Sequence, residues 1–245
     1  MINKDQGVTL IELAVVLFIV SLVLGGVLLP LSTRLEQEER RQTTEMLQDI
    51  KETLVGFTLV NGYLPCPDCP DNTTGSCGLV QTGLGASAIN DGIEDGLDNV
   101  PAPTNTRPNF MSCATVEGNL PWVTLGLPEF DAWENRFVYR VDDDFADNDA
   151  SLTCTTTASF CLDDVGNINV QDENSNPVAQ NIPFIVLSLG NEDSNAGTSQ
   201  NENQDGDITF VYRDYSNETD AFDDLMTWVS TPTLMYQMVR AELLP

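Results

Sequence analysis

Cysteines are the side chains of this chain best suited to covalent or metal chemistry, and there are six: Cys66, Cys69, Cys77, Cys113, Cys154 and Cys161. The first two are separated by two residues, a spacing found in redox dithiols and, with two further thiolates, in zinc sites. An even cysteine count is also typical of disulfide-linked exported domains. We favour disulfides, leave the connectivity of the first four open, and keep a zinc site and a redox pair as alternatives. The last two flank a six-residue turn and are predicted to pair with each other.

Acidic residues gather in two stretches that are suited to binding a hard cation. Residues 90–98 (NDGIEDGLD) combine carboxylates with glycines, and a second stretch, residues 188–207, contains Glu192, Asp193, Asp205 and Asp207. Calcium takes about 6–8 oxygen ligands, which flexible acidic loops supply, although neither stretch has EF-hand spacing. Both stretches are therefore candidate calcium sites. The alternative is a solvated acidic surface that keeps the protein soluble.

The overall composition argues against several functions. The chain has 245 residues, of which 38 are acidic and 10 basic, and a net charge of −28. Residues 61–245 carry 30 of the acids and five of the bases, so no nucleic-acid partner is expected for this part. There is no histidine, which removes the Ser-His-Asp and Cys-His arrangements. No nucleophile elbow or nucleotide-binding loop is present, and we predict that the protein is not an enzyme.

The N-terminus has a long apolar run that is directly preceded by one acidic residue. Residues 13–31 are nineteen residues without a charge, close to the roughly 20 that cross a bilayer as a helix. Glu12 lies directly before this run, where a carboxylate near hydrocarbon costs about 2.5–3.5 kcal/mol and needs a partner. No small-residue cleavage site follows the apolar run. The candidate processing point therefore precedes it, between Gly7 and Val8.

The heptapeptide at residues 7–13, GVTLIEL, resembles the prepilin cleavage and methylation motif of type IV pilins and type II secretion pseudopilins. The family usually has Phe where this chain has Val8. The resemblance implies that a prepilin peptidase cuts after Gly7 and methylates the new amine of Val8. It also implies that the Glu12 carboxylate meets the Val8 amine of a neighbouring subunit during assembly.

The same resemblance implies a cellular place and a set of partners. The chain would be a single-pass inner-membrane protein with its head in the periplasm, and would then join a filament. Its partners would be other pilin or pseudopilin subunits, the prepilin peptidase, the inner-membrane assembly machinery and, before assembly, membrane lipid. We expect a structural subunit, a pseudopilin or minor pilin. The alternative is a tip-located adhesin that recognises a ligand through its head loops.

One long helix is expected to follow the leader, over residues 8–60. Gly25, Gly26 and Pro30 weaken it, so we expect a break or kink there. Beyond Pro30 the pattern is amphipathic and predicts packing under the sheet of the head, with an apolar stripe of Leu35, Met46, Ile50, Leu54 and Phe57. A free coiled-coil stalk is the alternative. Gly62 and Pro65 are expected to end the helix.

The head is expected to be loop-rich at first and sheet-forming later. Residues 131–139 (DAWENRFVY) are similar to a segment of major pseudopilins that forms a turn leading into a strand, although Glu134 replaces the usual Gly. In that family a loop after a Ser-x-Gly strand end binds calcium, and Ser188-Leu189-Gly190 echoes it here. Further elements are predicted as strands at 182–189, 208–212 and 225–229 and a helix from Thr231.

These elements predict a pilin-like α+β fold, in which a long N-terminal helix packs against a small antiparallel sheet with loop-rich, disulfide-stapled insertions. The expected organisation is a prepilin leader at 1–7, a transmembrane and assembly helix at 8–31, an amphipathic helix at 32–60 and an acidic exported head at 61–245.

Overall fold

The structure is a computed structural model that describes residues 9–71, 77, 89–98, 110–146, 160–191, 197–216 and 220–244. For residues 23–33, 97–98 and 110–111 the backbone alone is described. The chain divides into two compact units, Met1–Arg41 and Gln42–Pro245. The first helix, α1 (Leu10–Asn61), contributes residues to both units.

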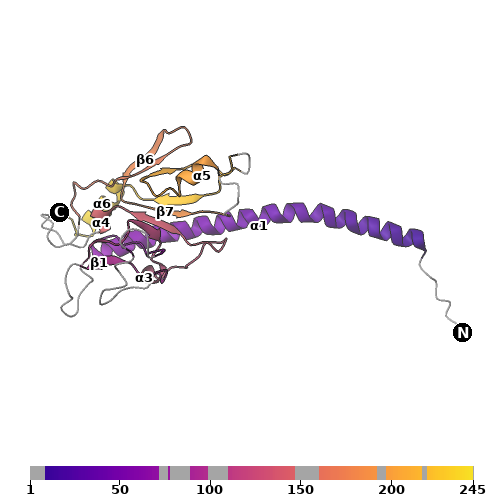
Figure 1. Cartoon of the computed structure of the whole chain (residues 1–245), viewed down its shortest axis with the longest axis horizontal. Helices are drawn as coiled ribbons and strands as arrows, with labels where there is room; N and C mark the ends of the chain where they lie inside the picture. Colours follow the sequence, from indigo (N-terminus) through magenta and orange to yellow (C-terminus); the bar gives the residue numbers. More distant parts are fainter. Residues whose placement is uncertain are drawn as a thin grey trace. The chain divides into compact units, whose positions relative to one another are not determined.

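Helix α1 runs without interruption through Gly25, Gly26 and Pro30 (Figure 1). The predicted break in the helix is therefore wrong. A proline removes one backbone hydrogen bond of the ladder, and the helical bonds on either side of it persist. The predicted end is confirmed, because Gly62 adopts a left-handed conformation (φ 84°) and its N–H donates to the carbonyl of Thr58 (2.8 Å). Glycine tolerates this conformation because it has no Cβ.

A four-stranded antiparallel sheet forms the centre of the second unit. Its strands are β3 (Glu117–Asn119), β4 (Val138–Val141), β7 (Phe184–Ser188) and β9 (Leu225–Trp228), in the order β3-β4-β7-β9. Tyr139 of β4 lies opposite Val186 of β7. The three strands predicted at 182–189, 208–212 and 225–229 are present, the middle one in a different sheet.

Residues 42–61 of α1 pack against one face of this sheet. Their buried positions recur at helical spacing, at Thr43, Leu47, Ile50, Leu54 and Thr58, so they form one stripe. The apolar members of the stripe share a core with one face of the sheet, which includes Tyr139, Phe184 and Val186. Leu35, predicted to belong to the stripe, is exposed in the other unit.

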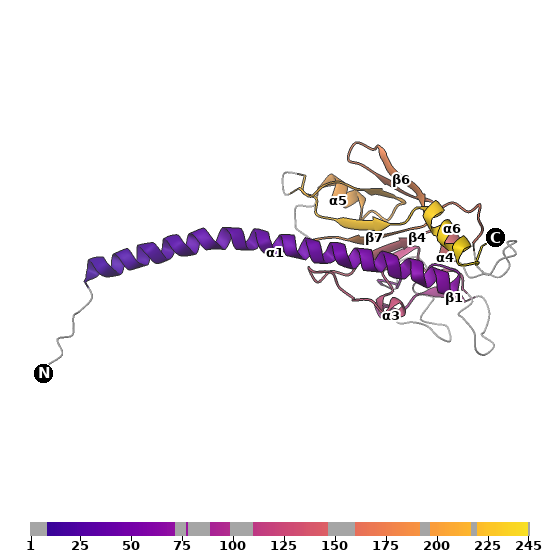
Figure 2. The ribbon, with the colours of Figure 1, turned by 180° about the vertical axis from the view of Figure 1, so that it is seen from behind.

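A second sheet covers the opposite face, and the sequence did not predict it. Its order is β6-β5-β8, built from β5 (Ile168–Gln171), β6 (Pro177–Ile182) and β8 (Thr209–Val211), with β5 and β8 parallel. Both views place β6 on the side of β7 away from α1 (Figure 1 and Figure 2). Phe184 and Val186 face the helix core, whereas Ile185 and Leu187 join the second core. Strand β7 is therefore buried on both faces, which is typical of a strand with a continuous apolar run.

Short elements complete the head. Strands β1 (Gly96–Asp98) and β2 (Phe110–Cys113) pair as an antiparallel ribbon. Three helices have four or five residues each, namely α3 (Trp122–Leu125), α4 (Asp143–Ala146) and α5 (Thr198–Glu202). The predicted C-terminal helix is α6 (Thr231–Arg240), which begins after Ser230 with a proline in its first turn. The α+β prediction is confirmed: a long N-terminal helix lies on a small antiparallel sheet in a disulfide-stapled head.

Candidate functional site

The first turn of α1 has the Thr9 half of a capping box. Thr9 precedes the helix, and its hydroxyl oxygen accepts a hydrogen bond from the backbone N–H of Glu12 (3.3 Å). The hydroxyl in turn approaches Oε2 of Glu12 at 3.5 Å. Thr-x-x-Glu is the sequence pattern of this cap, which satisfies backbone donors at a helix start. Glu12 therefore has a local structural role that sequence reasoning missed, although the Thr9–Glu12 spacing could have indicated it.

Apolar side chains surround α1 on every side over residues 10–22. Their exposed fractions run from 46% at Val20 to 89% at Leu10. A helix that is apolar all round is stable only where water is excluded, in a bilayer or against partner helices. Glu12 is the one ionisable residue in this segment.

The processing point lies outside the described residues, because Gly7 and Val8 are not among them. The predicted apolar run, residues 13–31, is described in part, since the side chains of residues 23–33 are not. Within the described part of the chain, no helix reaches both the length and the hydropathy needed to cross a membrane.

The four clustered cysteines form two disulfides, Cys66–Cys113 and Cys69–Cys77, with sequence separations of 47 and 8. The alternatives of a four-thiolate zinc site and of a Cys66–Cys69 redox pair are therefore wrong. Each sulfur is already bonded to a residue other than its CxxC neighbour. Cys161 is also disulfide-bonded, and its predicted partner Cys154 lies outside the described residues.

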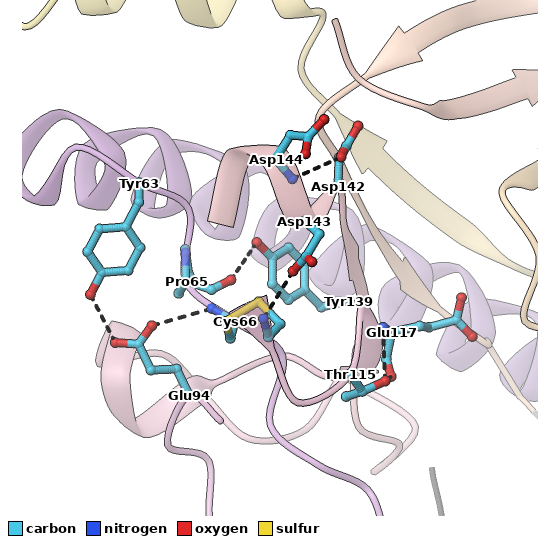
Figure 3. Close-up of a disulfide and its surroundings, with 11 residues drawn as sticks. Tyr63, Pro65, Cys66, Glu94, Thr115, Glu117, Tyr139, Asp142, Asp143 and Asp144 are labelled. Carbon is cyan, nitrogen blue, oxygen red and sulfur yellow. Dashed lines mark hydrogen bonds between the residues drawn. A yellow bond between two sulfur atoms is a disulfide. The ribbon is translucent and has the colours of Figure 1, made fainter. Parts of the chain in front are cut away.

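Half-buried carboxylates flank the Cys66–Cys113 disulfide (Figure 3). Oε2 of Glu94 accepts a hydrogen bond from the backbone N–H of Cys66 (3.3 Å), and Oε1 accepts one from the Tyr63 hydroxyl (3.4 Å). On the other side, the backbone N–H of Cys113 donates to Oδ1 of Asp143 (3.0 Å). Burial raises the pKa of Glu94 to about 7, against the opposing effect of these hydrogen bonds. The backbone N–H groups of both disulfide-bonded cysteines thus donate to carboxylates.

The turn at residues 131–135 is tight despite Glu134. Oδ1 of Asp131 accepts hydrogen bonds from the backbone N–H groups of Trp133 and Asn135, both at 2.9 Å. Glu134 is forced into a left-handed conformation (φ 67°), which explains why glycine is usual at this position in the similar pseudopilin segment. The predicted turn into β4 is confirmed.

That turn is tied to the end of β7. The Ser188 hydroxyl donates to Oδ2 of Asp131 (2.6 Å), and the side-chain amide of Asn135 donates to the Gly190 carbonyl (2.7 Å). The turn therefore positions the start of the second acidic stretch, residues 188–207.

The structure brings together only some of the proposed calcium ligands in that stretch. Asp205 and Asp207 lie with Glu202 in a group whose carboxylate oxygens are within 4.8 Å of one another. Glu192 and Asp193 lie outside the described residues. The trio is largely exposed, and exposed acidic groups repel one another only weakly in water.

A buried acid lies near this stretch and was not predicted. Oδ2 of Asp224 accepts a hydrogen bond from the side-chain amide of Asn203 (2.7 Å), whereas its Oδ1 is buried and has no partner among the described residues. Asn203 also pairs with both backbone groups of Val211. Burial raises the pKa of Asp224 to about 7. Nothing local in the sequence separates Asp224 from the many exposed acids.

Comparison with known proteins places the N-terminus in a family. Residues 2–28 match the prokaryotic N-terminal methylation motif. This motif marks type IV pilin and pseudopilin proteins, so the cleavage and methylation motif predicted at residues 7–13 is confirmed. No curated protein and no solved structure matches the chain. The N-terminus therefore carries the motif found in type IV pilin-like and pseudopilin precursors, which a prepilin peptidase processes.

Proposed function

We propose that this protein is a structural subunit, a pseudopilin or minor pilin, of a type IV pilus-like filament or a type II secretion pseudopilus. The observation that carries the proposal is the apolar surface over residues 10–22, which has exposed side chains around the whole helix. The head has a buried core of its own, whereas the apolar side chains of residues 10–22 are all exposed, so in this proposal they are buried first by lipid and then by neighbouring subunits. The N-terminal methylation motif supports this reading.

Glu12 is the residue that gives the assembly its register in this proposal. Its described contacts are with Thr9, a neutral residue. The partner of its charge is the amine of Val8 on a neighbouring subunit, created when the leader is cut after Gly7. Removing one partner of a buried ion pair typically costs about 3–5 kcal/mol, so loss of the carboxylate should be felt in the filament and not in the isolated chain.

Two variants separate the charge of Glu12 from its capping role. Glu12→Gln keeps a side chain that can complete a capping box but removes the charge. Thr9→Ala removes the cap and leaves the charge. We expect Glu12→Gln to be processed normally and to form few or no filaments, and Thr9→Ala to form them near the wild-type level. Equal defects in both variants, or normal filaments from Glu12→Gln, would contradict the intersubunit pair.

The cellular place follows from the same proposal. The precursor resides in the inner membrane as a single-pass protein with its head in the periplasm, and the inner-membrane assembly machinery transfers it from lipid to the filament. Intact-mass measurement of purified native filaments tests this. The expected mass is that of a chain beginning at a methylated Val8 with three disulfides. A mass that retains residues 1–7 would contradict it.

Calcium is proposed as a ligand of residues 188–207, with Glu192, Asp193, Asp205 and Asp207 as the candidate ligands. Supporting observations are the grouping of Glu202, Asp205 and Asp207 and the unpartnered oxygen of nearby Asp224. The test is calorimetric titration of the full chain with calcium. Asp207→Asn should remove one equivalent of bound calcium, and unchanged stoichiometry would reject this loop.

A second candidate function, a tip-located adhesin, is favoured by one feature of the second sheet. A groove of about 480 Å³ runs along it, lined by Tyr212, Tyr215, Val178, Arg213 and Asp172, among others. Exposed tyrosines beside charged groups are common in binding surfaces. Quantitative mass spectrometry of filaments separates the two functions, because a tip adhesin is present at far fewer copies than a main structural subunit.

A further inference from the structure

One buried carboxylate of the head has a hydrogen-bond partner at only one of its two oxygens. Asp95 is 1% exposed. Its Oδ2 accepts a hydrogen bond from the backbone N–H of Cys69 (2.8 Å), whereas its Oδ1 is buried and has no hydrogen-bond partner in the described structure. Buried polar atoms are nearly always paired, so this carboxylate oxygen is available to a ligand.

A second buried acid lies on the segment that Asp95 contacts. Asp68 is fully buried. Asp95 contacts the two residues on either side of Asp68 in the chain, because the Asp95 N–H donates to the Pro67 carbonyl (3.3 Å) and the Cys69 N–H donates to Asp95. Oδ1 of Asp68 accepts from the backbone N–H of Asp91 (3.3 Å), and Oδ2 from the side chain of Asn119 (3.1 Å). Each oxygen accepts one described hydrogen bond and keeps a further lone pair.

The charges of these two acids are not neutralised by any described cation. The ion pairs of the head join Arg136 to Glu129, Arg140 to Glu117, and Arg213 to Glu173 and Asp220. None of these described pairs includes Asp68 or Asp95. Burial, and then repulsion from Asp95, raises the pKa of Asp68 to about 6. Burial and repulsion from Asp91 raise the pKa of Asp95 to about 6. The two carboxylates are therefore buried without a described counter-charge.

The available donors select a hard cation. The chain has no histidine, and the nearby sulfurs of Cys66, Cys69, Cys77 and Cys113 are all in disulfides, which leaves only oxygen ligands. Oxygen-only sites suit calcium, whose coordination is flexible and includes water and backbone carbonyls. We propose that Asp68 and Asp95 bind a calcium ion, at a site separate from residues 188–207.

The two segments that hold the acids are firmly positioned. Both disulfides begin in the segment of Asp68, at Cys66 and Cys69, and Gly92 lies in the segment of Asp95. Gly92 packs so closely on Trp122 that a Cβ would lie 2.4 Å from the indole. The Gly92 carbonyl accepts hydrogen bonds from the N–H groups of Val123 and Thr124 (2.8 and 3.1 Å). The ion thus enters a preorganised loop, which lowers the entropic cost of binding.

The test measures the unfolding temperature of the full chain in detergent, with calcium and with a chelator. Wild type should gain roughly 5–10 °C at calcium 100-fold above its dissociation constant. Asp95→Asn keeps an acceptor for Cys69 and removes the buried charge. Its unfolding temperature should rise less with calcium than that of wild type, by the share that this site contributes. In chelator, its unfolding temperature should equal or exceed that of wild type. Asp49→Asn, an equal charge change at an exposed position of α1, should respond as wild type does.

Several outcomes would overturn the proposal. These are a full calcium response in Asp95→Asn, an equal loss in Asp49→Asn, or an equal effect of magnesium at the same concentration, which would indicate charge screening. Asp207→Asn separates the two proposed calcium sites, because it changes a candidate ligand of residues 188–207 and leaves Asp68 and Asp95 in place. If residues 188–207 bind no calcium, Asp207→Asn behaves as wild type while Asp95→Asn loses the whole response.

A second measurement covers the case in which Asp95→Asn does not fold. Terbium, a luminescent ion with calcium-like coordination, is added to wild type and to two tryptophan variants. The site lies in the loop that packs on Trp122, so Trp122→Phe should abolish most of the sensitised emission that calcium displaces. Trp228→Phe should retain it. Emission that depends on Trp228 alone would reject the Asp68–Asp95 site.

Discussion

The N-terminal segment, residues 10–22, and the compact unit of residues 42–245, which contains the head, differ in how far their apolar side chains are exposed. In the head, Leu54 and Phe184 are fully buried between a helix and a sheet, while in the N-terminal segment Leu10 and Leu22 are 89% and 64% exposed. The head also carries disulfides and nearly all the charge. The difference shows that the head is stabilised by its own contacts, whereas the N-terminal segment has contacts to gain only from other molecules.

Loss of the Cys66–Cys113 disulfide should produce the largest effect on the head. Closing a loop of 47 residues stabilises by about 4 kcal/mol in the chain-entropy model, against about 2.5 kcal/mol for the 8-residue loop of Cys69–Cys77. Denaturant unfolding of the two double Cys→Ala variants measures both. If the order were reversed, native contacts around Cys69 and not loop entropy would dominate. Filament assembly by the N-terminal segment should need neither disulfide once the head is folded.

Matched leucine substitutions sharpen the contrast between the two regions. Leu54→Ala opens a cavity in the fully buried core shared by α1 and the sheet and should cost about 3 kcal/mol. Leu17→Ala, at a position that is 61% exposed, should change the unfolding free energy by less than about 0.5 kcal/mol and should weaken filament assembly. A head that is destabilised by Leu17→Ala would contradict the view that residues 10–22 do not contribute to its stability.

Acidity should stabilise the head through Glu94. Because burial raises its folded pKa from 4.5 to about 7, the folded state holds the proton more tightly than the unfolded state. Stability should therefore be highest below pH 4.5 and fall by about 2 kcal/mol as the pH rises to 7. Unfolding of wild type and Glu94→Gln is compared across this range, in chelator. Glu94→Gln should be more stable than wild type at pH 8, and its unfolding free energy should fall less steeply between pH 4.5 and 7. If the unfolding free energies of the two proteins changed in parallel with pH, Glu94 would not be the group responsible.

The smallest expected effect is at the turn before β4. Glu134 is exposed and holds a left-handed φ of 67°, which disfavours residues with a Cβ. Glu134→Gly should stabilise the head by about 0.5–1 kcal/mol. Glu134→Ala is the control, since it removes the charge but keeps the Cβ, and it should give no such gain. Equal gains in both would assign the effect to charge and not to backbone conformation.

Local patterns in the sequence were enough for several elements. The apolar stripe at Ile50 and Leu54, the glycine at 62 and the Ser-Thr-Pro start of α6 each act over one or two helical turns. The hairpin of β5 and β6 was missed because β6 is mostly exposed and polar. Its turn was nevertheless readable. Asp172 accepts hydrogen bonds from the N–H groups of Asn174 and Asn176, a turn for which aspartate is typical.

Residue types and short-range periods were enough to predict the N-terminal motif, the long helix, the three later strands and the acidic, histidine-free character of the head. Tertiary packing sets which cysteines pair, that a second sheet covers β7, and which of the described acids are buried with an unpartnered oxygen, namely Asp95 and Asp224. Those features join residues far apart in the chain. Burial is a property of the packed molecule, and a single aspartate carries no local mark of it.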